Sequence, residues 1–557
     1  MSKRDELEAD VIIVGSGPGG GSLAWGLCTM GVRVLLLEAG PAFVPSRDYP
    51  QTASDWERHE FPHPKGSRGR YTFAPLQALD GSLRKELGSW NAGQGPLNRS
   101  GYRSGWRYHH VRGVGGSTLH FIGEAHRLHP RAFRIRTEHG IGADWPIDYQ
   151  ALEPWYAKAE ALIGVAGEEE PSRPRSSPFP MPAHAPGYAA QRLRNASSLN
   201  WHPNSLAVLS RPFQGRPACN YCSACNRGCP RTDKGSTDVT FIRQALASGR
   251  LTLMPQTEAV SLVAGPSDRV AALIASTGKN KYKRIQGRFY VIACGAVETP
   301  RLLLLSANNH APRGLANESG QVGRNFMETI FWKSTGLHPH SLGSHRGLPA
   351  DLVCWDFNAP DAIPNVIGGC RFTHSTAEGG FNGPIAHATR ALAGWGARHR
   401  RQLQKEFGHL LSIGAIGESL PHPDSRITLD PKRKDAFGRP LARIHSHLDK
   451  MAIERLRFMA RKSREILQEV GAEELREEYG SYDFFSSTHV FGTARMGLDP
   501  ETSVVNADGR SHRWTNLYIS DASVFPSSGG GESPSLTIAA LGLRMARHIA
   551  DRLMRRE

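Results

Sequence analysis

The sequence lacks any long hydrophobic run. No stretch of about 18 uncharged apolar residues occurs in the 557 residues, so we expect no transmembrane helix. Low-complexity segments are also absent, and an apolar share of 39% is typical of a globular protein long enough for two or more domains. The charged lead before the first apolar run has no hydrophobic region and no cleavage site. We therefore expect no secretory signal and a cytoplasmic location.

Acidic residues are scarce relative to basic ones. The chain has 68 Lys and Arg against 52 Asp and Glu, which gives a net charge of +16. The basic residues are scattered and form no basic helix or aromatic-rich patch, so we expect no nucleic-acid partner. A basic surface that meets an acidic protein or an anionic membrane is one interpretation, and solvated charge without a partner is the other.

The stretch from Asp10 to Pro41 is the strongest motif. Residues 11–14 are four apolar residues in a row, which predicts a strand buried on both faces. A glycine-rich turn follows, then a predicted helix over 22–30 and a second buried strand over 32–37 that ends at Glu38. The turn contains Gly15, Gly17, Pro18 and Gly20.

This order of elements predicts a dinucleotide site. The glycines allow a tight turn, close approach of a pyrophosphate and close packing of the helix on the strand. Glu38 can accept hydrogen bonds from both ribose hydroxyls and disfavours a 2′-phosphate, which favours NAD or FAD over NADP. A plain strand–helix–strand unit without a ligand is the alternative interpretation.

A second glycine-rich turn lies in VRGVGGSTLHF. Its candidate ligand-facing residues are Gly115, Gly116, Ser117, Thr118 and His120. Together with the first motif, this segment resembles the glucose–methanol–choline (GMC) family of flavin oxidoreductases. The following HRLHP and ADWPIDYQ segments resemble the flavoprotein subunits of bacterial fructose, glucose and gluconate-type dehydrogenases. In some members of the family the histidine matching His120 is bonded covalently to the flavin and in others it is not, so covalent attachment here is a hypothesis.

The resemblance implies further contacts with FAD. A strand that ends in Gly-Ala and opens an apolar helix at Thr-Pro resembles the second family signature, with Ala307 where that signature has Gly. Another strand ends in an acidic residue that contacts the ribityl–phosphate region in the family. The implied cofactor contacts are Val260, Gly295, Asp521, Ala522, Pro534 and Thr537.

Half of the eight cysteines are clustered. Cys28, Cys294, Cys354 and Cys370 are isolated and are most simply buried packing residues. The others follow the spacing C-x2-C-x2-C-x3-C-P, which matches an iron–sulfur run and also satisfies a tetrahedral zinc site. Two disulfides are the third interpretation. The dehydrogenase subunits that the chain resembles carry an iron–sulfur cluster at this point with a different spacing. The four residues are Cys219, Cys222, Cys225 and Cys229.

The last residues of the chain carry the expected chemistry. The His489–Gly497 segment contains His-x-x-Gly-Thr-x-x-Met-Gly and resembles the family's active-site strand, with His489 at the catalytic histidine. Many relatives have Asn or His before the Pro that opens the last helix, but here the residue is Ser533. A hydroxyl is a poor general base, so we expect His489 to take the substrate proton and Ser533 to stabilise the oxygen charge.

We therefore predict an α/β (α+β) fold. It has a Rossmann-type FAD-binding domain with a parallel sheet and a substrate-binding domain on a largely antiparallel sheet. The FAD-binding domain is expected from residues 1–45, 91–135, 216–328 (with the cysteine loop) and 481–557, a lid or irregular excursion from 46–90, and the substrate domain from 136–215 (including a crossing segment) and 329–480.

The expected activity is FAD-dependent oxidation of a CH–OH group, of a sugar or glycoside, to a carbonyl. Electrons would pass to an external acceptor, a quinone or cytochrome, by way of an iron–sulfur cluster if the cysteines hold one. The alternatives are an alcohol oxidase that reduces O2 to peroxide and a non-enzymatic electron-transfer flavoprotein. The resemblance also implies a small subunit, whose export signal would make the periplasm the alternative location.

Overall fold

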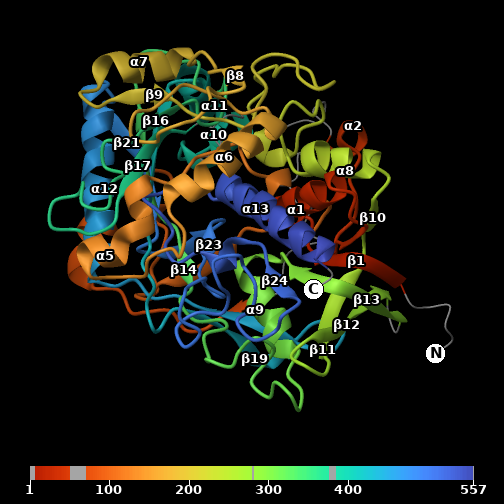
Figure 1. Ribbon diagram of the computed structural model, residues 1–557. Coiled ribbons are helices and arrows are strands. Elements are labelled where there is room, and N and C mark those ends of the chain that lie inside the picture. Colours follow the sequence, from red (N-terminus) through yellow and green to blue (C-terminus); the bar gives the residue numbers. More distant parts are fainter. Residues whose placement is uncertain (1–6, 50–70, 279–280, 376–383, 556–557) are drawn as a thin grey trace.

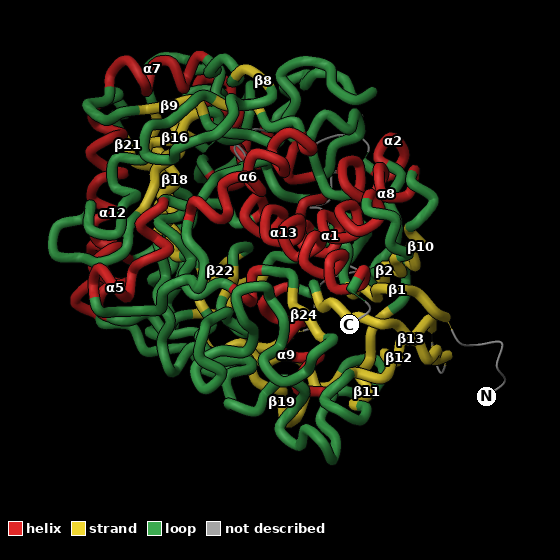
Figure 2. The backbone as a smooth tube through the Cα atoms, viewed as in Figure 1, coloured by secondary structure: helices red, strands yellow, loops and turns green. Residues whose placement is uncertain are grey.

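The protein consists of two large sheets with helices between and around them. The structure is a computed structural model that describes residues 7–49, 71–278, 281–375 and 384–555 (Figure 1). In Figure 2 the strands of the two sheets lie on opposite sides of α6 (Tyr149–Ile163) and α13 (Ser535–Met554). Among the described residues, no helix is both long and apolar enough to cross a bilayer.

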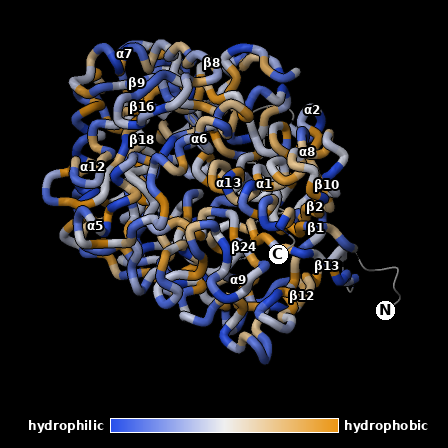
Figure 3. Tube along the Cα trace, in the orientation of Figure 1, coloured by the Kyte–Doolittle hydropathy of each residue, from blue (hydrophilic) through white to orange (hydrophobic). Residues whose placement is uncertain are grey.

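The first sheet is the predicted nucleotide-binding sheet. Its strand order is β10-β2-β1-β13-β12-β11, with β24 beside β13, and all pairs are parallel except β13–β12 and β12–β11. All four side chains of β2 are buried, as expected for a parallel strand covered on both faces, and apolar residues gather around β1 and β2 in Figure 3. The strands are β1 (Leu7–Val14), β2 (Val34–Leu37), β10 (Leu251–Met254), β11 (Glu258–Ala264), β12 (Val270–Gly278), β13 (Lys281–Ile292) and β24 (Leu517–Ile519).

Helix α1 (Pro18–Thr29) begins four residues before the predicted helix start. Proline is favoured in the first turn of a helix because its missing N–H would have no partner there, and Pro18 extends the helix to the glycine turn. Helix α13 packs against α1. A Cβ on Gly26 would lie 2.6 Å from the Cβ of Ala546, so the close approach of the two helices requires glycine at this position.

The second sheet has eight strands, and all of its pairs are antiparallel. Its order is β5-β4-β21-β15-β18-β17-β16-β9, and α12 (Lys450–Glu469) packs on one face, which confirms the predicted mixed α/β fold. The strands are β4 (Trp90–Asn91), β5 (Gly95–Pro96), β9 (Trp201–Pro203), β15 (Ile330–Leu337), β16 (Leu352–Cys354), β17 (Cys370–His374), β18 (Leu410–Gly417) and β21 (Glu474–Gly480).

Alternation along these strands sends different side chains to the two faces. Trp332 on β15 and Ile413 on β18 belong to the apolar core that includes Met459 of α12. Neighbouring residues in sequence point to the opposite face because successive strand side chains alternate. Lys333 therefore faces away from α12, and so does Arg371 on β17, which neighbours the core residue Phe372.

Smaller elements complete the fold. Part of the predicted excursion over 46–90, residues 50–70, lies outside the described residues, and the domain boundaries stay predictions.

Short sheets and helices surround the two large sheets. They are β3 (Tyr71–Phe73) with β19 (Arg426–Lys434) and β20 (Pro440–His445), β6 (Ser104–Tyr108) with β22 (Phe484–Ser487), β14 (Met327–Glu328) with β23 (Val490–Phe491), β7 (Ala166–Gly167) with β8 (Met181–Pro182), α2 (Pro45–Asp48), α4 (Arg84–Leu87), α5 (Ile135–His139), α7 (Tyr188–Ala196), α8 (Arg243–Ala247), α9 (Gly295–Leu305), α10 (Pro384–Arg390) and α11 (Gly396–Glu406).

Candidate active site

A cavity of about 1020 Å³ connects the two sheets. Its walls include the glycine turn after β1, the turn at Gly116, the start of α9, the loop before α13 and one face of the second sheet. This volume is at the upper end for small-molecule sites, which leaves room for a dinucleotide and a substrate. His489 and Ser533 line the cavity together with the nucleotide turn, so the fold brings both predicted halves of the site into one space.

The nucleotide end of the cavity contains Glu38 at the carboxyl end of β2. Its carboxylate accepts hydrogen bonds from the hydroxyl of Ser16 (2.6 Å) and the backbone N–H of Gly40 (2.9 Å). Burial raises the pKa of Glu38, and these two hydrogen bonds oppose the rise. Glu38 lines the cavity beside Gly15 and Gly17, where a ribose next to a pyrophosphate would be held.

The two glycine-rich turns pack against each other. A Cβ on Gly116 would lie 2.8 Å from the Cα of Gly17, and the backbone N–H of Gly115 donates to the Ser16 hydroxyl (3.1 Å). A Cβ on Gly17, by contrast, would meet no protein atom within 4 Å. Packing of the protein therefore does not require glycine at position 17, whereas close approach of a phosphate does, and the site fits FAD.

Asp521 joins the start of α9 to the segment that follows β24. Its carboxylate accepts from the backbone N–H of Gly295 (2.9 Å), the hydroxyl of Thr299 (2.5 Å) and the backbone N–H of Ser523 (2.8 Å). Burial raises the pKa of Asp521, and these partners lower it. Together with Asp521, several other predicted cofactor residues line the cavity: Pro18, Ser117, Thr118, His120, Gly295, Ala522 and Pro534.

Four predicted cofactor residues do not line the cavity. A Cβ on Gly20 would lie 1.9 Å from the carbonyl oxygen of Gly15, so Gly20 serves packing of the turn. Gly115 contributes its backbone bond to Ser16, and Thr537 is fully buried with its hydroxyl 2.8 Å from that of Tyr156. Near Val260 the cavity is lined by the preceding residues 257–259 of the chain.

His120 and Phe121 lie where the second turn meets the cavity. Burial lowers the pKa of His120 well below its ordinary value, and nearby positive groups lower it further. The imidazole is therefore neutral. Lys234 holds this segment in place, since its buried ammonium donates to the carbonyls of Leu119 (2.9 Å), Phe121 (2.9 Å) and Cys225 (2.6 Å). Covalent attachment at His120 stays a hypothesis.

The cysteine loop is next to this segment, but its thiols do not converge on one metal position. The Sγ of Cys229 donates to Asp233 (3.0 Å), and that of Cys219 accepts from the backbone N–H of Tyr221 (3.3 Å). Cys225 is buried and Cys222 is exposed. Within the described ranges, no three His, Cys, Asp or Glu side chains are arranged to hold a metal ion, and no disulfide is present. The arrangement of these thiols therefore does not fit an iron–sulfur or zinc site.

His489 is the candidate proton acceptor. It lies directly before β23 and faces the cavity, while its backbone carbonyl accepts from the N–H of Thr329 (2.9 Å) and the hydroxyl of Ser487 (2.8 Å). Burial lowers the pKa of His489 to about 4; Glu124 raises it and Arg371 lowers it. The imidazole is therefore neutral at neutral pH and able to accept a proton.

Sequence reasoning missed a buried ion pair beside Ser533. Arg371 donates to both carboxylate oxygens of Glu124, at 2.8 and 2.6 Å, and the Ser533 hydroxyl also donates to Glu124 (2.7 Å). Burial raises the pKa of Glu124, but Arg371 and His126 lower it more and hold it at about 2. Glu124 closely follows the second glycine turn, which is the one signal that could have found it; Arg371 has none.

The substrate side of the cavity is polar. Lys333 on β15 pairs across the sheet with Tyr479 on β21, and both line the cavity. Glu477 on β21 forms an ion pair with Arg390 of α10, whose guanidinium donates a hydrogen bond to it (2.5 Å), and both residues line the cavity as well. This wall therefore offers hydrogen-bond donors and acceptors at several points around a bound molecule.

Comparison with known proteins finds one family. Two family models described as GMC oxidoreductase match residues 112–330 and 421–542. The fructose dehydrogenase large subunit of Gluconobacter japonicus is 29% identical, covering 99% of each chain. The 2-methyl-1,2-propanediol dehydrogenase of Mycolicibacterium austroafricanum is 29% identical (98% of this chain, 96% of the relative), and the 6'''-hydroxyparomomycin C oxidase of Streptomyces lividus is 30% identical (98% and 92%).

Solved structures show the same fold. Pyridoxine 4-oxidase from Mesorbium loti superposes with a TM-score of 0.64 at 18% identity, covering 97% of this chain and 99% of that one. A formate oxidase variant of Aspergillus oryzae RIB40, studied for FAD modification, gives a TM-score of 0.65 at 15% identity, covering 99% of each chain.

Proposed function

The chain belongs to the GMC oxidoreductase family, and we propose that it oxidises a CH–OH group of a sugar or glycoside to a carbonyl and passes the electrons to an external acceptor. One observation carries the proposal. The neutral His489 faces the same cavity as the nucleotide turn and the polar wall of the second sheet. A proton acceptor, a site for FAD and a surface for hydroxyl groups therefore share one space.

The residues of the chain divide the work. FAD, when bound, supplies a hydride acceptor for the carbon of the substrate. His489 accepts the hydroxyl proton of the substrate at its ring nitrogen, and its low pKa keeps it neutral until it does so. Glu38 and Asp521 hold the nucleotide, and the fully buried Arg371 places positive charge beside the reacting oxygen.

The wall of the cavity supports a polyhydroxylated substrate. Lys333, Arg390 and Glu477 line the side away from the nucleotide turn. A simple aliphatic alcohol has few groups that can form hydrogen bonds with such a wall. Sugar hydroxyls both donate and accept, so they match this wall. Relatives named for fructose and for an aminoglycoside derivative support the same class.

The electron acceptor and the cysteine loop form a separate part of the proposal. Relatives with similar coverage are named both dehydrogenases and oxidases. We favour a quinone or cytochrome acceptor, with a small subunit as a further partner. The thiols of the cysteine loop do not converge on one metal position, so the proposed electron path does not pass through them. Iron, acid-labile sulfide and zinc measured per flavin in anaerobically purified protein decide between a cluster and structural thiols.

The test is flavin reduction under anaerobic conditions. D-fructose, D-glucose, D-gluconate and 2-methyl-1,2-propanediol are mixed in turn with the FAD-loaded protein, and bleaching of the oxidised flavin band is followed. We expect a sugar to bleach the band and His489→Ala to retain FAD without bleaching. Normal reduction in His489→Ala would sink the assignment. Peroxide formed at the rate of turnover in air would favour the oxidase alternative.

A further inference from the structure

We propose that Glu124, held by Arg371, is a positioning residue that makes the Ser533 hydroxyl a hydrogen-bond acceptor for a second substrate hydroxyl, on the carbon next to the one oxidised. The preferred substrate is then a 1,2-diol unit. This inference rests on the proposed function and deepens it, because it specifies what the site recognises beside the reacting CH–OH group.

The Glu124 carboxylate has no acceptor site left. Its Oε1 accepts from Asn204 (3.1 Å) and Arg371 (2.8 Å), and its Oε2 accepts from Arg371 (2.6 Å) and Ser533 (2.7 Å). A carboxylate offers about four lone-pair sites, and all four are used. Glu124 therefore binds no substrate hydroxyl directly, and its effect on the reaction passes through its neighbours.

Arg371 fixes the carboxylate in this orientation. Its two terminal nitrogens donate hydrogen bonds to the two carboxylate oxygens of Glu124. Its Nε donates to the carbonyl of Gly531 (2.6 Å), in the same loop as Ser533. Both partners of the pair are nearly fully buried. A planar guanidinium held at three points leaves the carboxylate little freedom, so the acceptor offered to Ser533 is stationary.

The backbone around Ser533 is held as firmly as its side chain. The Ser533 N–H donates to Nδ1 of His126 (3.1 Å), and Nε2 of His126 lies 2.8 Å from Oδ1 of Asn204. These bonds assign the proton of the neutral imidazole to Nε2. Asn204 in turn donates to Glu124, so the four side chains and one peptide form a closed ring.

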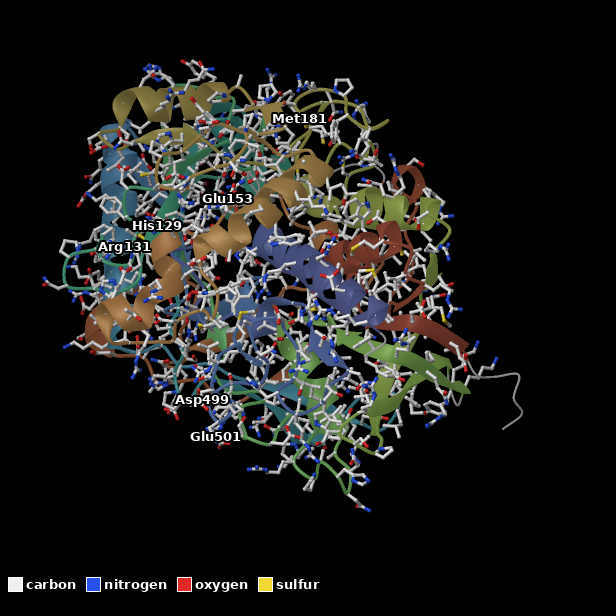
Figure 4. All side chains as sticks on the ribbon, in the orientation of Figure 1. His129, Arg131, Glu153, Met181, Asp499 and Glu501 are labelled. Carbon is white, nitrogen blue, oxygen red and sulfur yellow. The ribbon has the colours of Figure 1, made fainter. Side chains whose placement is uncertain are left out.

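The segment after Glu124 anchors the same loop from the other side. The backbone N–H of His129 donates to Glu532 (3.0 Å), the residue before Ser533. Arg131 pairs with Asp361 (2.7 Å), and His129 and Arg131 lie near each other by α5 in Figure 4. On the other side of Ser533, the hydroxyl of Ser535 donates to the carbonyl of Glu124 (3.2 Å), so residues both before and after Ser533 are bonded to the segment that carries Glu124.

A serine hydroxyl has one proton and two lone pairs. The Ser533 hydroxyl donates its one hydrogen bond to Glu124, so Ser533 faces the cavity as an acceptor. The oxyanion role expected from the sequence needs a donor, and the guanidinium of Arg371, which also lines the cavity, supplies the positive charge for it. The proton of the reacting hydroxyl goes to His489. A hydroxyl on the neighbouring carbon is the donor that Ser533 can receive.

Two alcohols of nearly equal size test this inference. 2-Methyl-1,2-propanediol and 2,2-dimethyl-1-propanol differ only by a hydroxyl in place of a methyl group. Each is titrated into the FAD-loaded His489→Ala protein, which is expected to hold FAD without reducing it and serves as the background for the variants below. Its dissociation constant is read from the change in the flavin spectrum, which then reports binding without turnover. We expect the diol to bind about tenfold to hundredfold more tightly, as for one hydrogen bond in a buried site.

Variants assign the preference to the residues. Ser533→Ala should bring the ratio of the two dissociation constants to about one, while Ser533→Thr, which keeps the hydroxyl, should preserve it. Glu124→Gln should also reduce the ratio, because an amide that donates to Ser533 frees the serine proton. If this variant fails to retain FAD, the Glu124→Gln/Arg371→Met double variant removes both buried charges and is measured instead.

The outcomes are distinct. A ratio near one in the His489→Ala protein, or an unchanged ratio when Ser533→Ala is added to it, overturns the inference. An unchanged ratio in the Glu124 variant overturns the role of Glu124 and leaves only Ser533. Failure of the proposed function has a different signature, since the diol would bind with the expected preference and no donor in the sugar and alcohol panel would bleach the flavin.

Discussion

Replacing Gly17 with Ala should weaken FAD binding while leaving the protein folded. Gly17 precedes α1 with φ −67° and ψ −170°, a conformation open to any residue, and its Cβ would meet no protein atom within 4 Å. Alanine at this helix-capping position costs at most about 1 kcal/mol of stability. The methyl group would instead occupy space beside the cavity where the pyrophosphate of FAD must approach. We expect FAD affinity to fall at least about tenfold, which is about 1.4 kcal/mol.

Gly15→Ala is the matched control, because it should damage the fold itself. Gly15 has φ +100°, and its Cβ would lie 2.3 Å from the carbonyl oxygen of Ala293, directly after the neighbouring strand β13. The backbone strain alone costs roughly 1–3 kcal/mol, and the overlap with a backbone atom adds to it. This variant should lose stability even without FAD.

Two measurements separate these effects. Thermal unfolding of the FAD-free proteins reports the fold, and quenching of FAD fluorescence on titration reports binding. The expected pattern is a small loss of unfolding temperature in Gly17→Ala with weak FAD binding, and a large loss in Gly15→Ala. Wild-type FAD affinity in Gly17→Ala would refute the argument that a ligand, and not packing, requires glycine at position 17.

Three further predictions concern the titratable side chains of His489, Lys234 and Arg127. Because desolvation lowers the pKa of His489 from 6.5 to about 4, flavin reduction should stay constant from neutral pH to about pH 5 and decline only below it; a decline centred near 6.5 would contradict a neutral, half-buried base. Lys234→Met leaves three backbone carbonyls without their donor, which costs about 1–3 kcal/mol for each carbonyl. The variant should therefore lose FAD on gel filtration, and full retention of FAD would count against a role of Lys234 in holding the segment that contains His120. Arg127→Met breaks buried pairs with Glu153 and Glu160, so the protein should unfold about 3–5 kcal/mol more easily in denaturant while its folded fraction reduces flavin normally; unchanged stability would show that the pairs contribute little.

Local sequence patterns predict most of the nucleotide half of the site. The run of apolar residues at 11–14 and the glycines after it predict β1 and the turn, because each requirement involves residues adjacent in sequence. Glu38 could be placed for the same reason. It directly follows β2, which pairs in parallel with β1, so it must lie beside the glycine turn that follows β1. The helix start was placed four residues late because the first turn of α1 consists of proline and glycines, which give no helical periodicity.

The substrate half depended on pairings that no local pattern records. Arg371 meets Glu124 only because β17 pairs with β18 in one register, and a shift of one residue would send Arg371 to the α12 face. The same holds for Lys333 and Glu477, which come from β15 and β21. The contact between Ser533 and Glu124 joins two loops 409 residues apart.

The sequence by itself therefore determined the strand and glycine turn of the nucleotide site and the family, and it predicted His489 and Ser533 as site residues, because these depend on short motifs whose spacing is set by the backbone. Only the tertiary structure decided which way the Ser533 proton points and what surrounds the substrate. Those features arise from strand register and from loops brought together by folding, where burial makes a carboxylate and a guanidinium pair.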